Sequence, residues 1–202
     1  MKLSALTAGL ALATLISSAA LAQGAPPTRV RGEVAGLDGN MLTVKSREGT
    51  AVMIKLADNW AAGLVSPVPA STIKKGAFVG IAAKPDRDGR LIAIEVLVLP
   101  EAMRGLGEGH YPWDLEPGSN MTNATIDATV IKGGSRTLKV SYKGGTQSIV
   151  VPKAAPVVTL GPGERSLVKP GAFVLVSATK GADGSLTAAR IAVGKDGSQP
   201  PM

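Results

Sequence analysis

The sequence predicts an all-β protein: two tandem five-stranded barrels, OB-like or SH3-like, that follow a signal peptide. Three observations support this prediction. The pentapeptide KGAFV at 75–79 recurs as PGAFV at 170–174, an offset of 95 residues. Apolar and polar residues alternate over short runs that end at glycine-containing turns, which is typical of half-buried antiparallel strands. The one long apolar run lies at the N-terminus.

Residues 1–22 have the three parts of a secretory signal peptide. Lys2 supplies the positive charge, an apolar run follows, and Ala20-Leu21-Ala22 fits a cleavage site. No later stretch approaches the roughly 18 apolar residues of a membrane-spanning helix, and the chain has no cysteine for a lipid anchor. We therefore expect an exported periplasmic protein with no membrane span after cleavage, in which residues 23–28 form a disordered leader.

The first barrel is expected at 29–99. Within it, 58–75 interrupts the alternation, and Pro67 and Pro69 exclude a long helix there. The turns contain Asn or Gly, which tolerate a positive φ angle. The expected strands are Val30–Gly36, Met41–Lys45, Ala51–Leu56, Ala77–Lys84 and Leu91–Leu99.

The second barrel is expected at 124–194, with its elements in the same order. An irregular, proline-containing stretch at 154–169 again separates three strands from two, and residues 195–202 form a polar tail. The expected strands are Ile126–Ile131, Thr137–Tyr142, Gln147–Val151, Ala172–Thr179 and Leu186–Val193.

Each repeat is therefore three strands, a loop or short helical turn, and two more strands. A sheet has to pair or cover its edges, and five short strands do this by closing into a small barrel of the OB type. A unit of about 70 residues buries only about 60% of its unfolded surface. We therefore expect the two barrels to pack together, with the connector at 100–123 between them.

The connector contains the only histidine, one of the two tryptophans and four acidic residues. A long connection without regular structure is usually either functional or a linker. One interpretation is a divalent transition-metal site formed by His110 with Glu108, Asp114 and Glu116, since imidazole and carboxylate groups bind such ions. The alternative is structural: Tyr111 and Trp113 dock against a barrel, and His110 hydrogen-bonds to nearby backbone.

Two further classes of function lack their signals. The chain has no Gly-x-Ser-x-Gly elbow, and no acidic pair stands out, so no catalytic constellation is recognisable. Nucleic-acid binding by such barrels uses exposed aromatic residues beside a basic groove. The chain has only six aromatic residues, and Phe78 and Phe173 occupy equivalent positions in apolar strands, which favours a place in the core. We therefore expect neither an enzyme nor a nucleic-acid-binding protein.

Several segments resemble a family of secreted proteobacterial proteins of unknown function with two OB-like repeats. They include Met103-Arg104-Gly105, Gly107-Glu108-Gly109-His110, Pro112-Trp113-Asp114-Leu115 and Leu56-Ala57-Asp58-Asn59-Trp60. The resemblance covers nearly all of the chain after the signal peptide and implies no assigned active site. Some members carry the automatic label of metal ABC transporter permease. The residues contradict that label, since a permease needs several membrane spans.

These observations favour an exported, non-enzymatic binding or scaffolding protein of the periplasm that needs no cofactor. Its partner would be an envelope protein or an anionic envelope polymer, because the formal net charge is +7. The alternative is a periplasmic metal-handling protein that uses His110 and the carboxylates near it.

Overall fold

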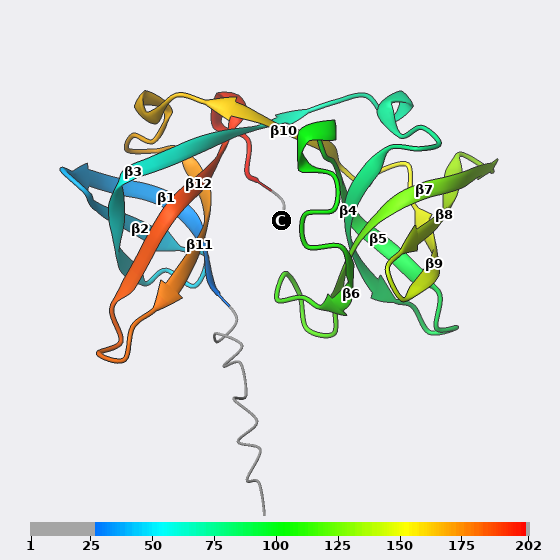
Figure 1. Ribbon diagram of the computed structural model, residues 1–202, viewed down its shortest axis with the longest axis horizontal. Helices are drawn as coiled ribbons and strands as arrows, with labels where there is room; N and C mark the ends of the chain where they lie inside the picture. Colours follow the sequence, from blue (N-terminus) through cyan, green and yellow to red (C-terminus); the bar gives the residue numbers. More distant parts are fainter. Residues whose placement is uncertain (1–26, 201–202) are drawn as a thin grey trace, which may run out of the picture.

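The computed structural model describes residues 27–200, which form an arch of two β-barrels joined at the top (Figure 1). The expected signal peptide at 1–22, most of the leader at 23–28 and the last two residues of the tail lie outside the described residues. Within the described part, all regular structure is β-strand or short 3-10 turn, so the prediction of an all-β protein is confirmed. The turns are η1 (Ala70–Thr72), η2 (Glu101–Met103), η3 (Arg165–Leu167) and η4 (Lys195–Gly197).

The first barrel is a closed ring of five strands in the order β1-β2-β3-β12-β11. All neighbours pair antiparallel except β3 and β12, which are parallel. The strands are β1 (Thr28–Asp38), β2 (Met41–Ser46), β3 (Ala51–Pro67), β11 (Phe173–Lys180) and β12 (Leu186–Gly194).

The second barrel repeats this arrangement in the order β7-β8-β9-β5-β4, with β9 and β5 parallel. Its strands are β4 (Phe78–Pro85), β5 (Leu91–Val98), β7 (Asn120–Lys132), β8 (Ser135–Tyr142) and β9 (Gly145–Val151). The five barrel strands of each repeat follow the predicted order, but Val157–Gly163, within the stretch at 154–169 that was expected to be irregular, forms an additional strand.

The strand pairing differs from the expected tandem arrangement. Residues 29–99 and 124–194 do not form one barrel each, because the repeats exchange their last two strands. The hairpin of β4 and β5, from the first repeat, pairs with β7 and β9 of the second. The hairpin of β11 and β12, from the second repeat, pairs with β1 and β3 of the first. Each barrel therefore contains three strands of one repeat and two of the other.

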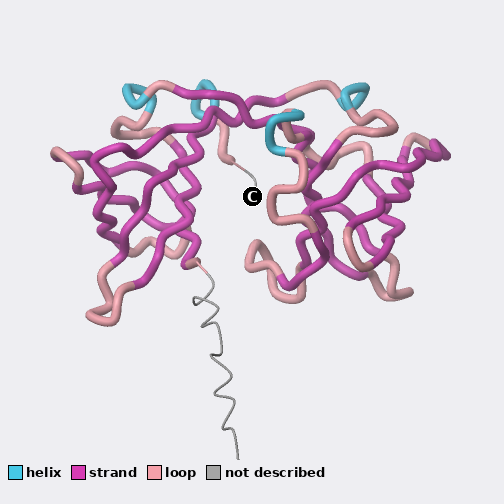
Figure 2. Tube along the Cα trace, in the orientation of Figure 1, coloured by secondary structure: helices cyan, strands magenta, loops and turns pink. Residues whose placement is uncertain are grey.

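The exchange follows from the path of the chain after the third strand of each repeat. A strand was expected to end at Leu56, but β3 extends for 17 residues to Pro67 and leads the chain across the molecule. There it pairs antiparallel with β10 (Val157–Gly163), and the two form the bridge at the top of the arch (Figure 2). Pro69, which follows, keeps the extended conformation. The next hairpin is therefore placed on the opposite barrel.

Three clusters of buried residues hold the molecule together. Two of them fill the barrels, with Leu42 and Ile54 in the first and Ile81 and Leu138 in the second, all fully buried. The third contains Phe78, Leu97 and Leu175 with residues of the bridge, and therefore joins the barrels from outside. The expectation that the two units pack together is confirmed. No helix among residues 27–200 is long and apolar enough to cross a membrane.

Candidate binding site between the barrels

The connector is more ordered than expected. After η2 it forms the short strand β6 (Gly109–Pro112), which pairs antiparallel with the start of β7 and places Tyr111 opposite Met121. The last four residues of the expected connector, 120–123, already belong to β7. The connector therefore covers part of the second barrel, on the side that faces the gap between the barrels (Figure 1).

The connector also contacts the first barrel through charged and aromatic side chains. The guanidinium of Arg29 lies 3.7 Å from the ring centroid of Trp113, within the range of a cation–π interaction. Arg31 Nη2 donates a hydrogen bond of 2.8 Å to Asp114 Oδ1. Partial burial opposes ionisation of Asp114, but the hydrogen bond from Arg31 and the charges of Arg31 and Arg29 outweigh it and lower its pKa. The expectation that Trp113 docks against a barrel is confirmed.

The four residues proposed as metal ligands do not come together. Among residues 27–200, no group of three or more His, Cys, Asp or Glu side chains could hold a metal ion. The reason is that each candidate has another partner. Besides Asp114 with Arg31, Glu108 accepts from the backbone N–H of Lys143 and Glu116 lies 3.6 Å from the ammonium of Lys84.

His110 is likewise engaged, though with a side chain instead of the expected backbone. Its Nδ1 lies 2.8 Å from Oγ1 of Thr122, a fully buried residue. The imidazole also stacks against Tyr142 of β8, with ring centroids 6.3 Å apart. This histidine therefore fastens β6 to the second barrel.

A pocket of ≈ 360 Å³ lies where the outer faces of the two barrels meet the connector. This volume is within the range of small-molecule sites. Residues that alternate with the barrel core supply its walls, since successive side chains of a strand point to opposite faces. The first barrel contributes Arg29, Leu175, Ser177, Arg190 and Ala192, the second Gly80, Leu97, Met121 and Asn123, and the remainder are Leu99, Leu106, Gly107, Tyr111, Trp113 and Leu160.

Some polar groups of this pocket have hydrogen-bond partners within the structure, and others have none. Asn123 Nδ2 donates to Oη of Tyr111 at 3.0 Å and to backbone carbonyl groups of the connector. In contrast, Nε1 of Trp113 is buried and has no acceptor within the structure. Arg190 is exposed, and its side chain makes no hydrogen bond or ion pair with any described residue. One donor and one cation at this pocket therefore lack a partner.

A buried acid lies beside the pocket on the second barrel. Glu95 is opposite Ala82 on β4, which in turn is opposite the pocket residue Met121. The Glu95 side chain is 0% exposed, and neither carboxylate oxygen has a hydrogen-bond partner. Burial raises its pKa to about 8, although the charges of Arg31 and Arg47 on the first barrel oppose the rise. At neutral pH this side chain is mainly uncharged.

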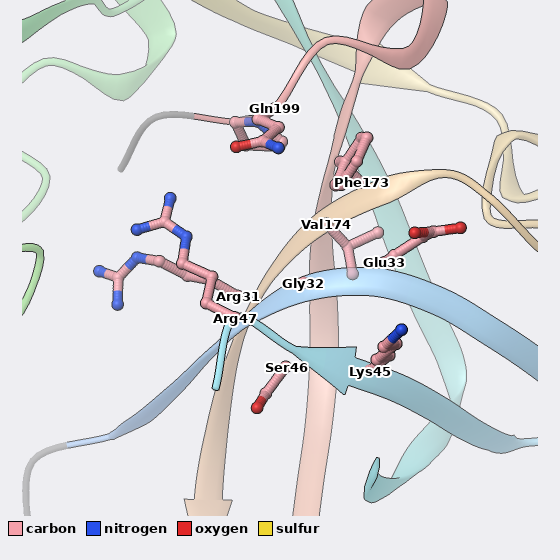
Figure 3. A pocket seen from close by; sticks show the side chains of 10 residues that line it. Arg31, Gly32, Glu33, Lys45, Ser46, Arg47, Phe173, Val174 and Gln199 are labelled. Carbon is pink, nitrogen blue, oxygen red and sulfur yellow. The ribbon is translucent and has the colours of Figure 1, made fainter. Parts of the chain in front are cut away.

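A second, smaller pocket of ≈ 290 Å³ lies on the first barrel, beside the C-terminal segment (Figure 3). Its walls include three cationic residues and Glu33. The side chains of Arg31 and Arg47 extend in the same direction, toward the side of the pocket on which Gln199 lies. Arg31 is already bound to Asp114, and few apolar side chains are present. This pocket therefore offers a less defined site than the one between the barrels.

Comparison with known proteins gives one match. Residues 120–192 match a family model described as a domain of unknown function, DUF5666. The match runs from the start of β7 into β12 and thus covers the second repeat, whose strands belong to both barrels. No curated protein and no solved structure matches the chain. The resemblance to secreted proteobacterial proteins therefore stays a prediction.

The sequence-based interpretation identified Tyr111 and Trp113 but missed the residues that face them. Arg29 and Arg190 lie on strands whose inward positions are apolar, and no motif in the sequence singles them out. The signal that was available is position: both residues occupy outward positions in the repeat. An outward position indicates a site here only because the outer faces of the two barrels meet.

Proposed function

We propose that this chain is an exported, non-enzymatic binding protein of the periplasm that holds a small ligand between two OB-type barrels. The strand order of each barrel supports the OB type. Numbered within one barrel, the ring runs 1-2-3-5-4, with the third and fifth strands parallel. Barrels of this type commonly serve as binding modules.

The pocket between the barrels is the observation that favours binding. It is lined mainly by apolar and aromatic side chains with a few polar groups, which is the usual composition of a small-molecule site. Because its walls come from both barrels and from the connector, the strand exchange holds all three parts in place. Export rests on the signal peptide expected at 1–22.

Native mass spectrometry of the protein purified from its envelope fraction tests this proposal. The expected result is a bound small molecule that is absent from the variant Ala192→Phe, because the new ring would fill the pocket. The matched control is Ala51→Phe, a substitution of an exposed alanine at the start of β3 that should keep the molecule. Equal retention by both variants would place the ligand elsewhere, and the absence of any bound molecule in all samples would count against the proposal.

A further inference from the structure

We propose that the pocket between the barrels takes an amphipathic carboxylic acid, with its apolar body between the barrels and its carboxylate at Arg190. This inference rests on the proposed binding function and adds the chemical class of the ligand. The walls of the pocket are mainly apolar, and no residue among 27–200 balances the charge of Arg190, which also lines it.

The apolar part of the site determines the body of the ligand. Leu97 of the second barrel and Leu175 of the first, which belong to one buried cluster, both line the pocket, and Tyr111 and Trp113 of the connector add aromatic walls. The rings of Tyr111 and Trp113 meet edge to face with centroids 6.2 Å apart. Such walls bind aliphatic or aromatic groups through loss of hydrated surface and van der Waals contact.

The charges around the pocket determine the sign of the charge on the polar end of the ligand. None of the residues that line it is acidic. The two cations are not equivalent, because Arg29 lies 3.5 Å from Asp114 and stacks on Trp113, whereas Arg190 has no ion-pair partner among residues 27–200. Glu95, the buried acid beside the pocket, is mainly protonated at neutral pH and therefore does not repel an anion.

The number of unpaired groups favours a carboxylate over a phosphate. One guanidinium balances one negative charge and matches the two oxygens of a carboxylate in a bidentate geometry. A phosphate monoester carries close to two charges at neutral pH, so one guanidinium would leave its second charge unbalanced.

Calorimetric titration with three isosteric probes tests this inference: para-butylbenzoate, its neutral amide, and the cation para-butylbenzylamine. We expect the acid to bind about tenfold more tightly than the amide, the difference that one charge-assisted hydrogen bond provides, and the amine not to bind. Arg190→Gln should weaken the acid to the level of the amide and leave the amide unchanged. Arg87→Gln, which removes the same charge from an exposed turn, is the matched control.

Tryptophan fluorescence gives a second readout of the same titrations. The acid should change the emission of the parent protein, and Trp113→Phe should lose the change while Trp60, which is buried in the first barrel, remains. Equal affinity for acid and amide, or an acid affinity that Arg190→Gln does not alter, would overturn the inference but leave the binding function standing. Failure of all three probes, together with the absence of a copurified molecule, would overturn both.

Discussion

Glu95 and Arg190 show how one position acquires two roles in a duplicated chain. They are separated by the repeat offset of 95 residues and lie on equivalent strands, β5 and β12. Both point outward from a barrel, yet Glu95 is fully buried and Arg190 is exposed. Equivalent positions in the two repeats therefore differ in what covers them from outside the barrel.

Burial of Glu95 predicts a pH-dependent stability. Its pKa rises from 4.5 to about 8 in the folded protein, so between these values the folded state keeps a proton that the unfolded chain has released. The free energy of unfolding therefore falls as the pH rises through this interval. Glu95→Gln should remove that fall, so that the variant matches the parent near pH 4 and is more stable above pH 8. Urea unfolding across this pH range measures the difference.

The exposed Glu33 provides the matched control for this measurement. Glu33→Gln removes the same carboxyl group from an exposed position and should leave the shape of the stability curve nearly unchanged. If the curves for the Glu95 variant and the parent ran parallel at all pH values, the buried carboxyl group would not be the source of the pH dependence.

Individual residues were predicted less well than the pattern to which they belong. Phe78 and Phe173 were both expected in the core because they occupy equivalent positions. Phe78 is 2% exposed and belongs to the core cluster that joins the barrels, as expected, whereas Phe173 is only half-buried and lines the pocket of Figure 3. Alternation states which face of a strand a residue occupies, but not which other surface covers that face. The sequence contains no local signal for such contacts.

At the level of elements, β1 contains two glycines that differ in their surroundings. A Cβ atom on Gly32 would lie 2.0 Å from the backbone oxygen of Lys45, whereas one on Gly36 would meet nothing within 4 Å. Close approach of β1 and β2 therefore requires glycine at the first position only.

Alanine at these two glycines should have opposite effects. Gly32→Ala forces β1 and β2 apart and should destabilise the protein by about 1–3 kcal/mol, the usual cost of overpacking. Gly36→Ala should be neutral or stabilise by up to about 1 kcal/mol, because it lowers the entropy of the unfolded chain. Thermal unfolding followed by circular dichroism measures both. Equal melting temperatures for the two variants would show that the strands can separate without cost.

The strands could be predicted because their evidence is local: alternation, β-propensity and glycine turns lie within a few residues of each other. The exchange of strands between the repeats could not be predicted. The tandem and the exchanged arrangement give every strand the same types of neighbour. A third strand has a fifth strand beside it in either case, and the same residues face the core. Only the path after Leu56 differs, and the prolines at 67 and 69 fit either an irregular loop or the end of an extended strand.

An engineered disulfide distinguishes the exchanged arrangement of the strands from the tandem one. Lys55 of β3 is paired with Thr187 of β12, and both side chains are exposed. The double variant Lys55→Cys with Thr187→Cys should therefore form an intramolecular disulfide under mild oxidation. Mass spectrometry of the unreduced peptides would identify it, and the assignment is unambiguous because the chain has no native cysteine.

The control exploits the repeat. In a tandem arrangement, the neighbour of Lys55 would be Ile92, which is equivalent to Thr187 at the offset of 95 residues. In the exchanged structure Ile92 lies in the second barrel, opposite Val150. Lys55→Cys with Ile92→Cys should therefore fail to cross-link. A disulfide in this control but not in the first pair would show that each repeat closes on itself.

The exchange also has a consequence for the order in which the chain becomes folded. The first barrel needs β11 and β12, the last two strands of the chain, before its ring can close. A chain that is synthesised from its N-terminus therefore presents β1, β2 and β3 with unpaired edges until synthesis is nearly complete. Contacts between such distant segments form slowly, and exposed edges invite aggregation during the delay. The exchange therefore predicts slower folding and more aggregation of the unfinished chain than the size of the barrels alone suggests.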